Sequence, residues 1–283
     1  MMKQNPFSLD LEGKTAVVTG AGGVLCGEFS RVIAATHAKV ALLDINLDAA
    51  RKTADEIRRD GGRAVAVQCD VLDKASIHSA HETVLKEFGK CSILLNGAGG
   101  NNPRATTTSE YFEKNLPESD LTFFDLTPEG FQFVFNLNFM GTLLPTQEFA
   151  RDMLDGGDNT IVNISSMNAF RPLTKIPAYS GAKAGISNFT QWLAVHFSRM
   201  GIRVNALAPG FFATGQTHVL FYNPDGTPTA RYQKILAHTP MGRLGTPEDL
   251  DGTLLWLLNS KASGFVTGVV VPIDGGFAAY SGV

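Results

Sequence analysis

Short apolar segments alternate with segments of helical periodicity along almost the whole chain of 283 residues. Strands that are separated by helices pair in parallel, and a parallel sheet needs helices on both of its faces. The alternation therefore predicts an α/β fold in one domain, residues 1–283, with about seven parallel strands in a doubly wound sheet. The expected strands are 15–20, 40–44, 64–68, 92–95, 161–166, 202–208 and 269–276.

Two segments break this alternation. Residues 101–127 are polar and mixed, with aromatic side chains spaced through them, and a loop of this length is usually functional or disordered. We interpret it as a loop over a ligand site, with disorder as the alternative. Residues 211–245 resemble a mobile lid, which would exclude water from a reaction beneath it.

The composition excludes several classes of protein. Charged residues make up 18% of the chain and the net charge is −3, so neither nucleic acid nor an anionic membrane surface is an expected partner. The amino-terminal residues lack an apolar core of signal-peptide length, and the longest apolar runs are too short to cross a bilayer. We therefore expect a soluble, cytoplasmic protein.

The cysteine pattern argues against a disulfide framework and against a bound metal. Cys26, Cys69 and Cys91 form no CxxC pair and have no nearby histidine cluster. We expect reduced, structural cysteines and no metal site. His78 and His81 are expected on the surface and flank of a helix that ends at Gly89.

The first strand leads through a glycine-rich turn into a helix. Gly20 and Gly23 would let backbone amides approach a pyrophosphate, whose charge the amino end of the helix then favours. A strand, a glycine turn and a helix in this order indicate a dinucleotide-binding unit. An ordinary turn is the alternative, because glycine runs are common in turns.

An acidic residue ends the second strand. Asp44 lies 24 residues beyond Gly20, where a carboxylate accepts hydrogen bonds from the adenosine ribose and repels a 2′-phosphate. This favours NAD over NADP, although Asp44 and Asn46 could instead cap the next helix. Asp70, after the third strand, could meet the adenine edge or cap the helix that follows it.

A tyrosine and a lysine four residues apart give the sequence its clearest chemical signal. On a helix, Tyr179 and Lys183 share one face, so the ammonium can favour the ionised phenol. A free phenol titrates near pH ~10, and it needs such a neighbour to transfer a proton at neutral pH. Ser166 could present a hydroxyl to the same substrate oxygen. Alone, the pair could equally be two ordinary helix residues.

Two further segments carry polar residues of interest. Residues 96–100 form a second turn of small residues, suited to backbone that passes close to a flat ligand. Thr127 and Pro128 begin a long helix in which Asn136 and Asn138 stand among apolar residues. A buried amide needs partners, so these asparagines either bond to helix neighbours or hold a water in a proton path.

Taken together, these segments resemble the short-chain dehydrogenase/reductase family over nearly the whole chain. The resemblance rests on Thr19-Gly20 with Gly23, Asp70, Asn96-Gly97-Ala98-Gly99, Asn138 with Gly141, Ser166, Tyr179, Lys183, Pro209-Gly210 and Asp274-Gly275-Gly276. It implies a Rossmann-type sheet, an NAD cofactor, a homotetramer and a catalytic tetrad. In that tetrad the tyrosine is the acid or base, the lysine lowers its pKa and holds the nicotinamide ribose, the serine orients the carbonyl and the asparagine anchors a water.

The resemblance also implies which residues contact the cofactor. They are Gly20, Gly23, Val24, Leu25, Asp44, Asp70, Val71, Asn96, Ala98, Gly99, Tyr179, Lys183, Pro209, Gly210 and Thr214. One departure concerns the first turn, where Val24 and Cys26 stand at the last two glycine positions of the family pattern. We expect binding to survive with an altered turn. Cys26 is expected to be an inert packing residue, with redox sensing as the alternative.

Within the family, four segments resemble the D-mannonate oxidoreductase (fructuronate reductase) branch: the turn at 23–25, the insert 99–108 and residues 135–147 and 209–214. The resemblance implies reversible reduction of a keto sugar acid with NADH, and gluconate-type or deoxygluconate dehydrogenases are the alternative. A nucleotide-binding regulator without catalysis is an alternative of another class. A sugar acid needs its carboxylate neutralised, and arginine binds both oxygens best. The substrate residues are expected among Ser166, Asn168, Arg171 and Arg104, with Lys175 as a further candidate cation.

Overall fold

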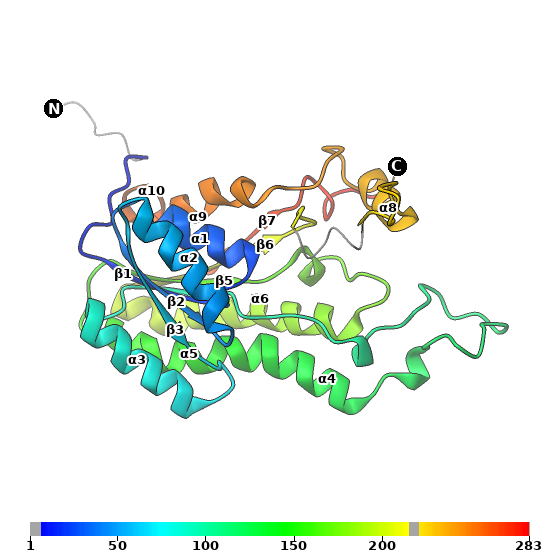
Figure 1. Cartoon of the computed structure of the whole chain (residues 1–283), viewed down its shortest axis with the longest axis horizontal. Coiled ribbons are helices and arrows are strands. Elements are labelled where there is room, and N and C mark those ends of the chain that lie inside the picture. The colour runs from blue at the N-terminus through cyan, green and yellow to red at the C-terminus, as the bar shows by residue number, and fades with distance from the viewer. Residues whose placement is uncertain (1–6, 215–220, 283) are drawn as a thin grey trace.

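A computed structural model of the chain describes residues 7–214 and 221–282. Its centre is a sheet of seven strands in the order β3-β2-β1-β4-β5-β6-β7, and every neighbouring pair is parallel. Helices cover both faces of this sheet (Figure 1). The predicted doubly wound α/β fold in one domain is confirmed.

The strands lie within two residues of the expected ranges, except that the last one ends three residues before the expected position. They are β1 Thr15–Thr19, β2 Lys39–Asp44, β3 Arg63–Gln68, β4 Ile93–Asn96, β5 Asn159–Ile164, β6 Ile202–Pro209 and β7 Val270–Ile273. The α-helices are α1 Val24–Ala34, α2 Leu47–Arg59, α3 Lys74–Phe88, α4 Pro128–Phe135, α5 Gly141–Phe149, α6 Pro177–Phe197, α8 Ala230–Ala237, α9 Asp251–Leu258 and α10 Ser260–Ser263.

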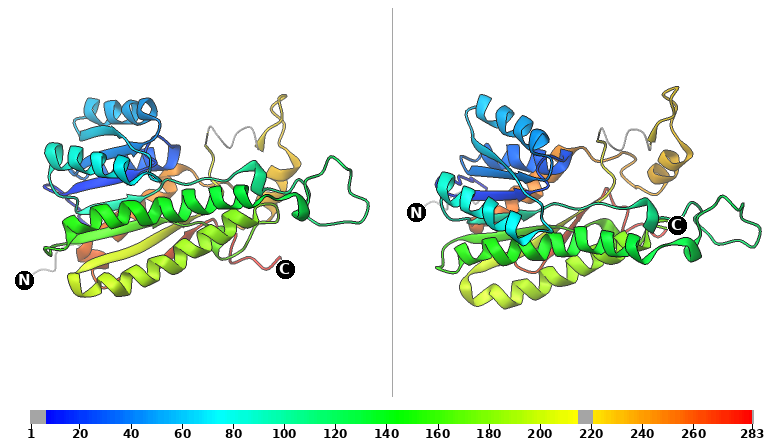
Figure 2. Two further views of the ribbon diagram at one scale, coloured as in Figure 1. Left: turned by 90° about the horizontal axis from the view of Figure 1, so that it is seen from below. Right: turned by 60° about the horizontal axis from the view of Figure 1, so that its bottom comes forward.

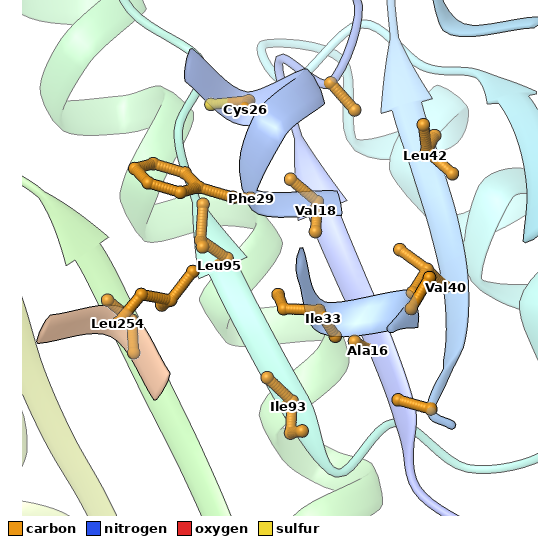
Figure 3. Close-up of a cluster of buried hydrophobic side chains, with 14 of the residues drawn as sticks. Ala16, Val18, Cys26, Phe29, Ile33, Val40, Leu42, Ile93, Leu95 and Leu254 are labelled. Carbon is orange, nitrogen blue, oxygen red and sulfur yellow. The ribbon is translucent and has the colours of Figure 1, made fainter. Parts of the chain in front are cut away.

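Helices α1, α2 and α9 bury one face of the sheet. In α1, Phe29 and Ile33 lie four residues apart on the buried side and are fully inaccessible to solvent. Figure 3 shows them among side chains of β1, β2 and β4, with Leu254 of α9 nearby. Because successive strand residues point to opposite faces, Ala16 and Val18 belong to this cluster whereas Val17 does not.

Helices α3, α5 and α6 bury the opposite face. Val17 and Leu94 pack there with residues of all three helices, including Ile77 of α3 and Phe149 of α5. Both faces of the central strands are therefore covered, which explains why every residue of β1, β4 and β5 is buried and why their apolar residues do not alternate with exposed polar ones.

The long helix predicted after Thr127 exists but contains an irregular turn. The Thr127 hydroxyl caps it by accepting from the Gly130 amide at 3.0 Å, as expected. Residues Asn136–Met140 then form a π-helical turn, η3, between α4 and α5. Such turns frequently occur at functional sites, and this one contains Asn138.

In the described parts of the two segments that break the alternation, regular structure is limited to short 3₁₀ turns and helix α8. Within 101–127 there are two short 3₁₀ turns, Pro103–Ala105 and Phe123–Asp125, and the chain between them extends away from the sheet (Figure 2). An ion pair between Glu110 and Lys234 of α8 joins it to the second segment. Residues 215–220 of the predicted lid 211–245 lie outside the described residues. The functions of both segments stay predictions.

Among the residues that the structure describes, none of the helices combines the length and the apolar character needed to cross a membrane.

Candidate active site

The predicted site residues gather at the carboxyl ends of the parallel strands. Strand β1 lies between β2 and β4, so the chain order reverses direction across the β1–β4 pair. Ligands of open α/β sheets bind in the crevice at this switch point. The glycine turn after β1 and the second turn after β4 meet at this position.

Close backbone packing makes glycine necessary at position 20. Gly20 has φ +70°, and a Cβ atom there would lie 2.9 Å from both the Cα and the amide nitrogen of Ala98. The Thr19 hydroxyl fixes the same junction by accepting from the amides of Gly97 at 3.1 Å and Ala98 at 3.3 Å. The two turns therefore form one rigid cradle of exposed backbone, which fits a dinucleotide.

The start of α1 completes this cradle. Gly23 is the residue before α1, and its amide donates to the Gly20 carbonyl at 3.0 Å. Val24 is 40% exposed at the first position of the helix, with Leu25 half-buried beside it. The first amide groups of α1 have no partner within the helix, and such groups can bind an anion such as a pyrophosphate.

Asp44 lies next to this turn. Its carboxylate accepts hydrogen bonds from the Gly22 amide and the Asn46 amide, both at 2.8 Å. The cap of α2 is the Asn46 side chain, which accepts from Ala49. The alternative that Asp44 and Asn46 cap this helix is therefore right for Asn46 and wrong for Asp44, whose carboxylate lies beside the glycine turn. Its contact with the cofactor stays a prediction.

Asp70 does not cap a helix either. The cap of α3 is Asp73, whereas Asp70 accepts from the Leu72 amide at 2.9 Å within its own turn. Val71 is buried and packs against Gly141, where a Cβ would approach it to 3.0 Å. The turn after β3 is thereby held against α5, and the adenine-edge role of Asp70 stays a prediction.

Ser166, Tyr179 and Lys183 come together as predicted. Ser166 follows β5, and its side chain is hydrogen-bonded to Tyr179. Tyr179 and Lys183 lie one turn apart on α6, with the Lys183 Nζ 5.5 Å from the centre of the Tyr179 ring. The same Nζ donates to the Ile164 carbonyl at 2.8 Å.

The pKa values of Tyr179 and Lys183 differ from the expectation. Burial raises the pKa of Tyr179, and the hydrogen bond with Ser166 opposes that rise. Burial also lowers the pKa of Lys183 to about 8. The expected lowering of the Tyr179 pKa is not observed, because desolvation is the largest effect on the phenol. The role of Lys183 in lowering that pKa stays a prediction. Lys183 is 3% exposed and Tyr179 is partly buried, which the sequence does not reveal.

Asn138 lies on the other side of the lysine. It is fully buried, and its amide NH₂ donates to the carbonyls of Gly100 at 2.7 Å and Val134 at 2.8 Å. A Cβ on Gly99 would lie 2.7 Å from the Asn138 Oδ1 and 3.3 Å from the Lys183 Nζ. The turn after β4 therefore brings Asn138 and Lys183 to one point, and the water-anchoring role of Asn138 stays a prediction.

Asn96 differs from the other expected cofactor residues because its side chain points into the protein. Its Nδ2 donates to Thr146 Oγ1 and Asn163 Oδ1, both at 2.9 Å, and Asn163 in turn donates to Thr190. This buried chain of polar groups joins β4 and β5 to α5 and α6 beneath the site. Sequence reasoning missed Asn163 and the threonines, since each alone is an unremarkable polar residue.

Cys26, which stands at a glycine position of the family pattern, packs against Gly97. A Cβ on Gly97 would lie 2.2 Å from the Cys26 Sγ, so the absence of a side chain at 97 makes room for the thiol. Cys26 is buried, and burial raises its pKa to about 12. A thiolate is the reactive form, so the redox-sensing alternative is disfavoured and the packing interpretation holds.

The turn after β6 closes the edge of the site. Gly210 donates to the Ile273 carbonyl at 2.9 Å, and a Cβ there would lie 2.6 Å from Asp274. Pro209 ends β6, and Thr214 is the last described residue before the gap at 215–220. The predicted contacts of these residues with a cofactor stay predictions.

The candidate substrate residues differ in how deeply they are buried. Asn168 is buried, and its Oδ1 has no hydrogen-bond partner among the described residues. Arg104 and Arg171 are exposed, and the Arg171 Nε donates to the Ala278 carbonyl at 3.1 Å. Lys175 donates to the Thr108 carbonyl and so supports the 101–127 segment. Asn168 is the candidate that geometry favours most.

Comparisons with known proteins support the same picture. Residues 14–224 match the short chain dehydrogenase family. An uncharacterised oxidoreductase of Haemophilus influenzae is 56% identical over 274 residues, or 97% of this chain and 96% of that protein. The 2-dehydro-3-deoxy-D-gluconate 5-dehydrogenase of Dickeya dadantii is 30% identical, over 96% of this chain and 98% of that enzyme.

A solved structure has a similar sequence identity to this chain. It belongs to a Haemophilus influenzae protein with the provisional name D-mannonate oxidoreductase, crystallised with bound NAD. The identity is 55%, the TM-score is 0.95, and the match covers 98% of this chain and 99% of that one.

The first prediction concerns the buried amine. Because the unfolded chain holds a proton at Lys183 that the folded chain releases, the contribution of Lys183 to stability rises with pH between about 8 and the usual 10.5. The expected gain over that whole interval is about 3–4 kcal/mol, because the two pKa values differ by 2.5 and each pH unit adds about 1.4 kcal/mol. Burial raises the pKa of the three cysteines, which lowers stability above about pH 9, so the Lys183 contribution is read as the difference between wild type and Lys183→Met in urea unfolding of the cofactor-free protein from pH 7 to 10. Lys86→Met, at an exposed position of α3, is the control; equal pH profiles for all three proteins would contradict the prediction.

The second prediction concerns the packing of Cys26 against Gly97. Gly97→Ala should lower the free energy of unfolding by about 1–3 kcal/mol, as overpacking usually does. Cys26→Ala should relieve that loss in the double variant, giving a coupling of about 1 kcal/mol or more. Urea unfolding of the four proteins in this double-mutant cycle measures the coupling. Strictly additive effects would show that the two positions do not compensate.

Proposed function

This chain belongs to the short-chain dehydrogenase/reductase family of oxidoreductases, and we propose that it uses NAD(H) to interconvert a keto sugar acid and its hydroxy acid. The pair that we propose is D-fructuronate and D-mannonate. The observation that carries the proposal is the convergence of Ser166, Tyr179 and Lys183 on the glycine cradle at the switch point. The substrate rests on the similarity to the Haemophilus influenzae protein described above.

The residues present fit a nicotinamide dinucleotide. Gly20 and Gly99 lie where side chains would collide with Ala98 and with Asn138, so the backbone alone lines the cradle. Asp44 would accept hydrogen bonds from the adenosine ribose, and it would repel the 2′-phosphate of NADP. NADH supplies the hydride when it is bound.

Tyr179 is the proposed proton donor during reduction. As hydride reaches the carbonyl carbon, the carbonyl oxygen gains negative charge, and the hydroxyls of Ser166 and Tyr179 stabilise it. Because burial raises its pKa, the phenol holds a proton at neutral pH and can give it to this oxygen. Lys183, whose pKa is lowered to about 8, can restore that proton.

Asn168 supports a polyhydroxylated substrate. A buried acceptor without a partner is unfavourable by about 1–3 kcal/mol, and a substrate hydroxyl group would satisfy the Asn168 Oδ1. We assign the substrate carboxylate to Arg171 and Arg104, whose exposed side chains are accessible to a ligand. A homotetramer, a cytoplasmic location and a lid at 211–245 belong to the proposal as well.

Turnover tests the assignment of Tyr179. Tyr179→Phe should lower kcat by at least about 100-fold, because general acid catalysis contributes about 10²–10⁴-fold, while NADH affinity stays within a few-fold. Assays with D-fructuronate, other keto sugar acids and simple ketones measure both the mechanism and the preference. If Tyr179→Phe kept more than a few per cent of turnover, the acid would be another group. A gluconate-type enzyme would prefer the corresponding gluconate substrates, and tight NADH binding without any turnover would indicate a regulator.

Cofactor preference tests the assignment of Asp44. Asp44→Ala removes the carboxylate that would repel a 2′-phosphate, so kcat/KM with NADPH relative to NADH should rise about tenfold, or about 1.4 kcal/mol. Asp48→Ala, at an exposed position of α2 that pairs with Arg51, is the matched control and should leave the ratio unchanged. An unchanged ratio in Asp44→Ala would mean that the carboxylate does not face the ribose.

A further inference from the structure

Two histidines and two carboxylates meet where α3 packs against α5. His78 and His81 lie three residues apart on α3, Glu148 belongs to α5, and Asp152 belongs to the following turn, η4 Ala150–Met153. The Nδ1 atoms of both histidines face one oxygen of Glu148, at 2.7 Å from His78 and 3.1 Å from His81. The expectation that both histidines lie on the surface or flank of α3 is wrong for His81, which is 8% exposed.

These atoms have the arrangement of a metal site with three protein ligands. One ligand atom from each of His78, His81 and Glu148 lies within 4.8 Å of the other two. A tetrahedral zinc ion with bond lengths of about 2.0–2.1 Å separates its ligands by about 3.3 Å. The two distances to Glu148 are close to this separation, so small side-chain rotations would admit the ion.

The groups around the histidines strengthen the case. Metal-bound histidines commonly donate their second ring nitrogen to a carboxylate, which fixes the orientation of the ring. The His81 Nε2 lies 2.9 Å from Asp152 Oδ2, and that same oxygen accepts from the Cys91 amide at 2.9 Å. The His78 Nε2 lies 3.6 Å from Glu82. Both rings thus have a carboxylate on the side away from Glu148.

We propose that His78, His81 and Glu148 bind one zinc ion, with a water in the fourth position. Two imidazoles and one carboxylate form a known zinc ligand set, and imidazole nitrogen disfavours calcium and magnesium. The site lies apart from the catalytic group, because Glu148 follows Asn138 by ten helical residues, or about 15 Å. The bound ion clamps α3 to α5. This proposal does not depend on the proposed enzymatic function.

Zinc titration of the full chain, after removal of metals with a chelator, tests the proposal. Calorimetry should give one zinc ion per chain, and zinc should raise the melting temperature. Asp152→Asn should weaken binding about 10–100-fold, the usual effect of losing a group that orients a ligand. His78→Gln should weaken it at least as much, and its fold should be unaffected because the His78 side chain is 63% exposed.

His37→Gln provides the matched control. His37 is also exposed and also lies beside a carboxylate, with its Nδ1 3.1 Å from Asp10, but it belongs to no such cluster within residues 7–214 and 221–282. This variant should bind zinc like the wild type. Wild-type affinity in folded His78→Gln, or the absence of a stoichiometric site in the wild-type protein, would overturn the proposal and leave the cluster as an ion-pair network.

Discussion

The close approach of two backbone turns between β1 and β4 determines the rest of the site. Gly20 touches Ala98 so tightly that no side chain can be added, and Thr19 ties both amides of the second turn to the first. This contact holds the cradle for the dinucleotide and also positions Gly99 against Asn138 and Lys183. A shift of either turn would therefore disturb cofactor binding and proton transfer together.

Burying the catalytic polar groups requires partners in the protein. Burying the Lys183 amine is unfavourable, which is why its pKa is lowered to about 8. Its hydrogen bond to the Ile164 carbonyl offsets part of this cost. Asn138 uses its amide on backbone carbonyls, and Asn96 extends a hydrogen-bonded chain beneath the site. The interior of this protein is thus preorganised for charge that develops near Tyr179.

The cysteine in the first turn shows how packing can preserve a motif that has changed. The bulk that Cys26 adds is accommodated by the missing side chain at Gly97, in a turn that follows a different strand. The seam between α3 and α5 illustrates a similar dependence on distant residues, because the carboxylates facing His81 come from positions 67 and 71 residues further along the chain. Both arrangements exist only once the helices are packed against the sheet.

The sequence by itself determined the strands, the order of the helices, the glycine turns and the tyrosine–lysine spacing, because these follow from local periodicity and from residues close in the chain. Tertiary structure decided the π-helical turn at Asn138, the burial that reverses the expected pKa change of Tyr179, the inward direction of Asn96 and the meeting of His81 with Glu148 and Asp152. The physical reason is that desolvation and hydrogen-bond partners depend on groups far apart in the chain, which no local pattern specifies.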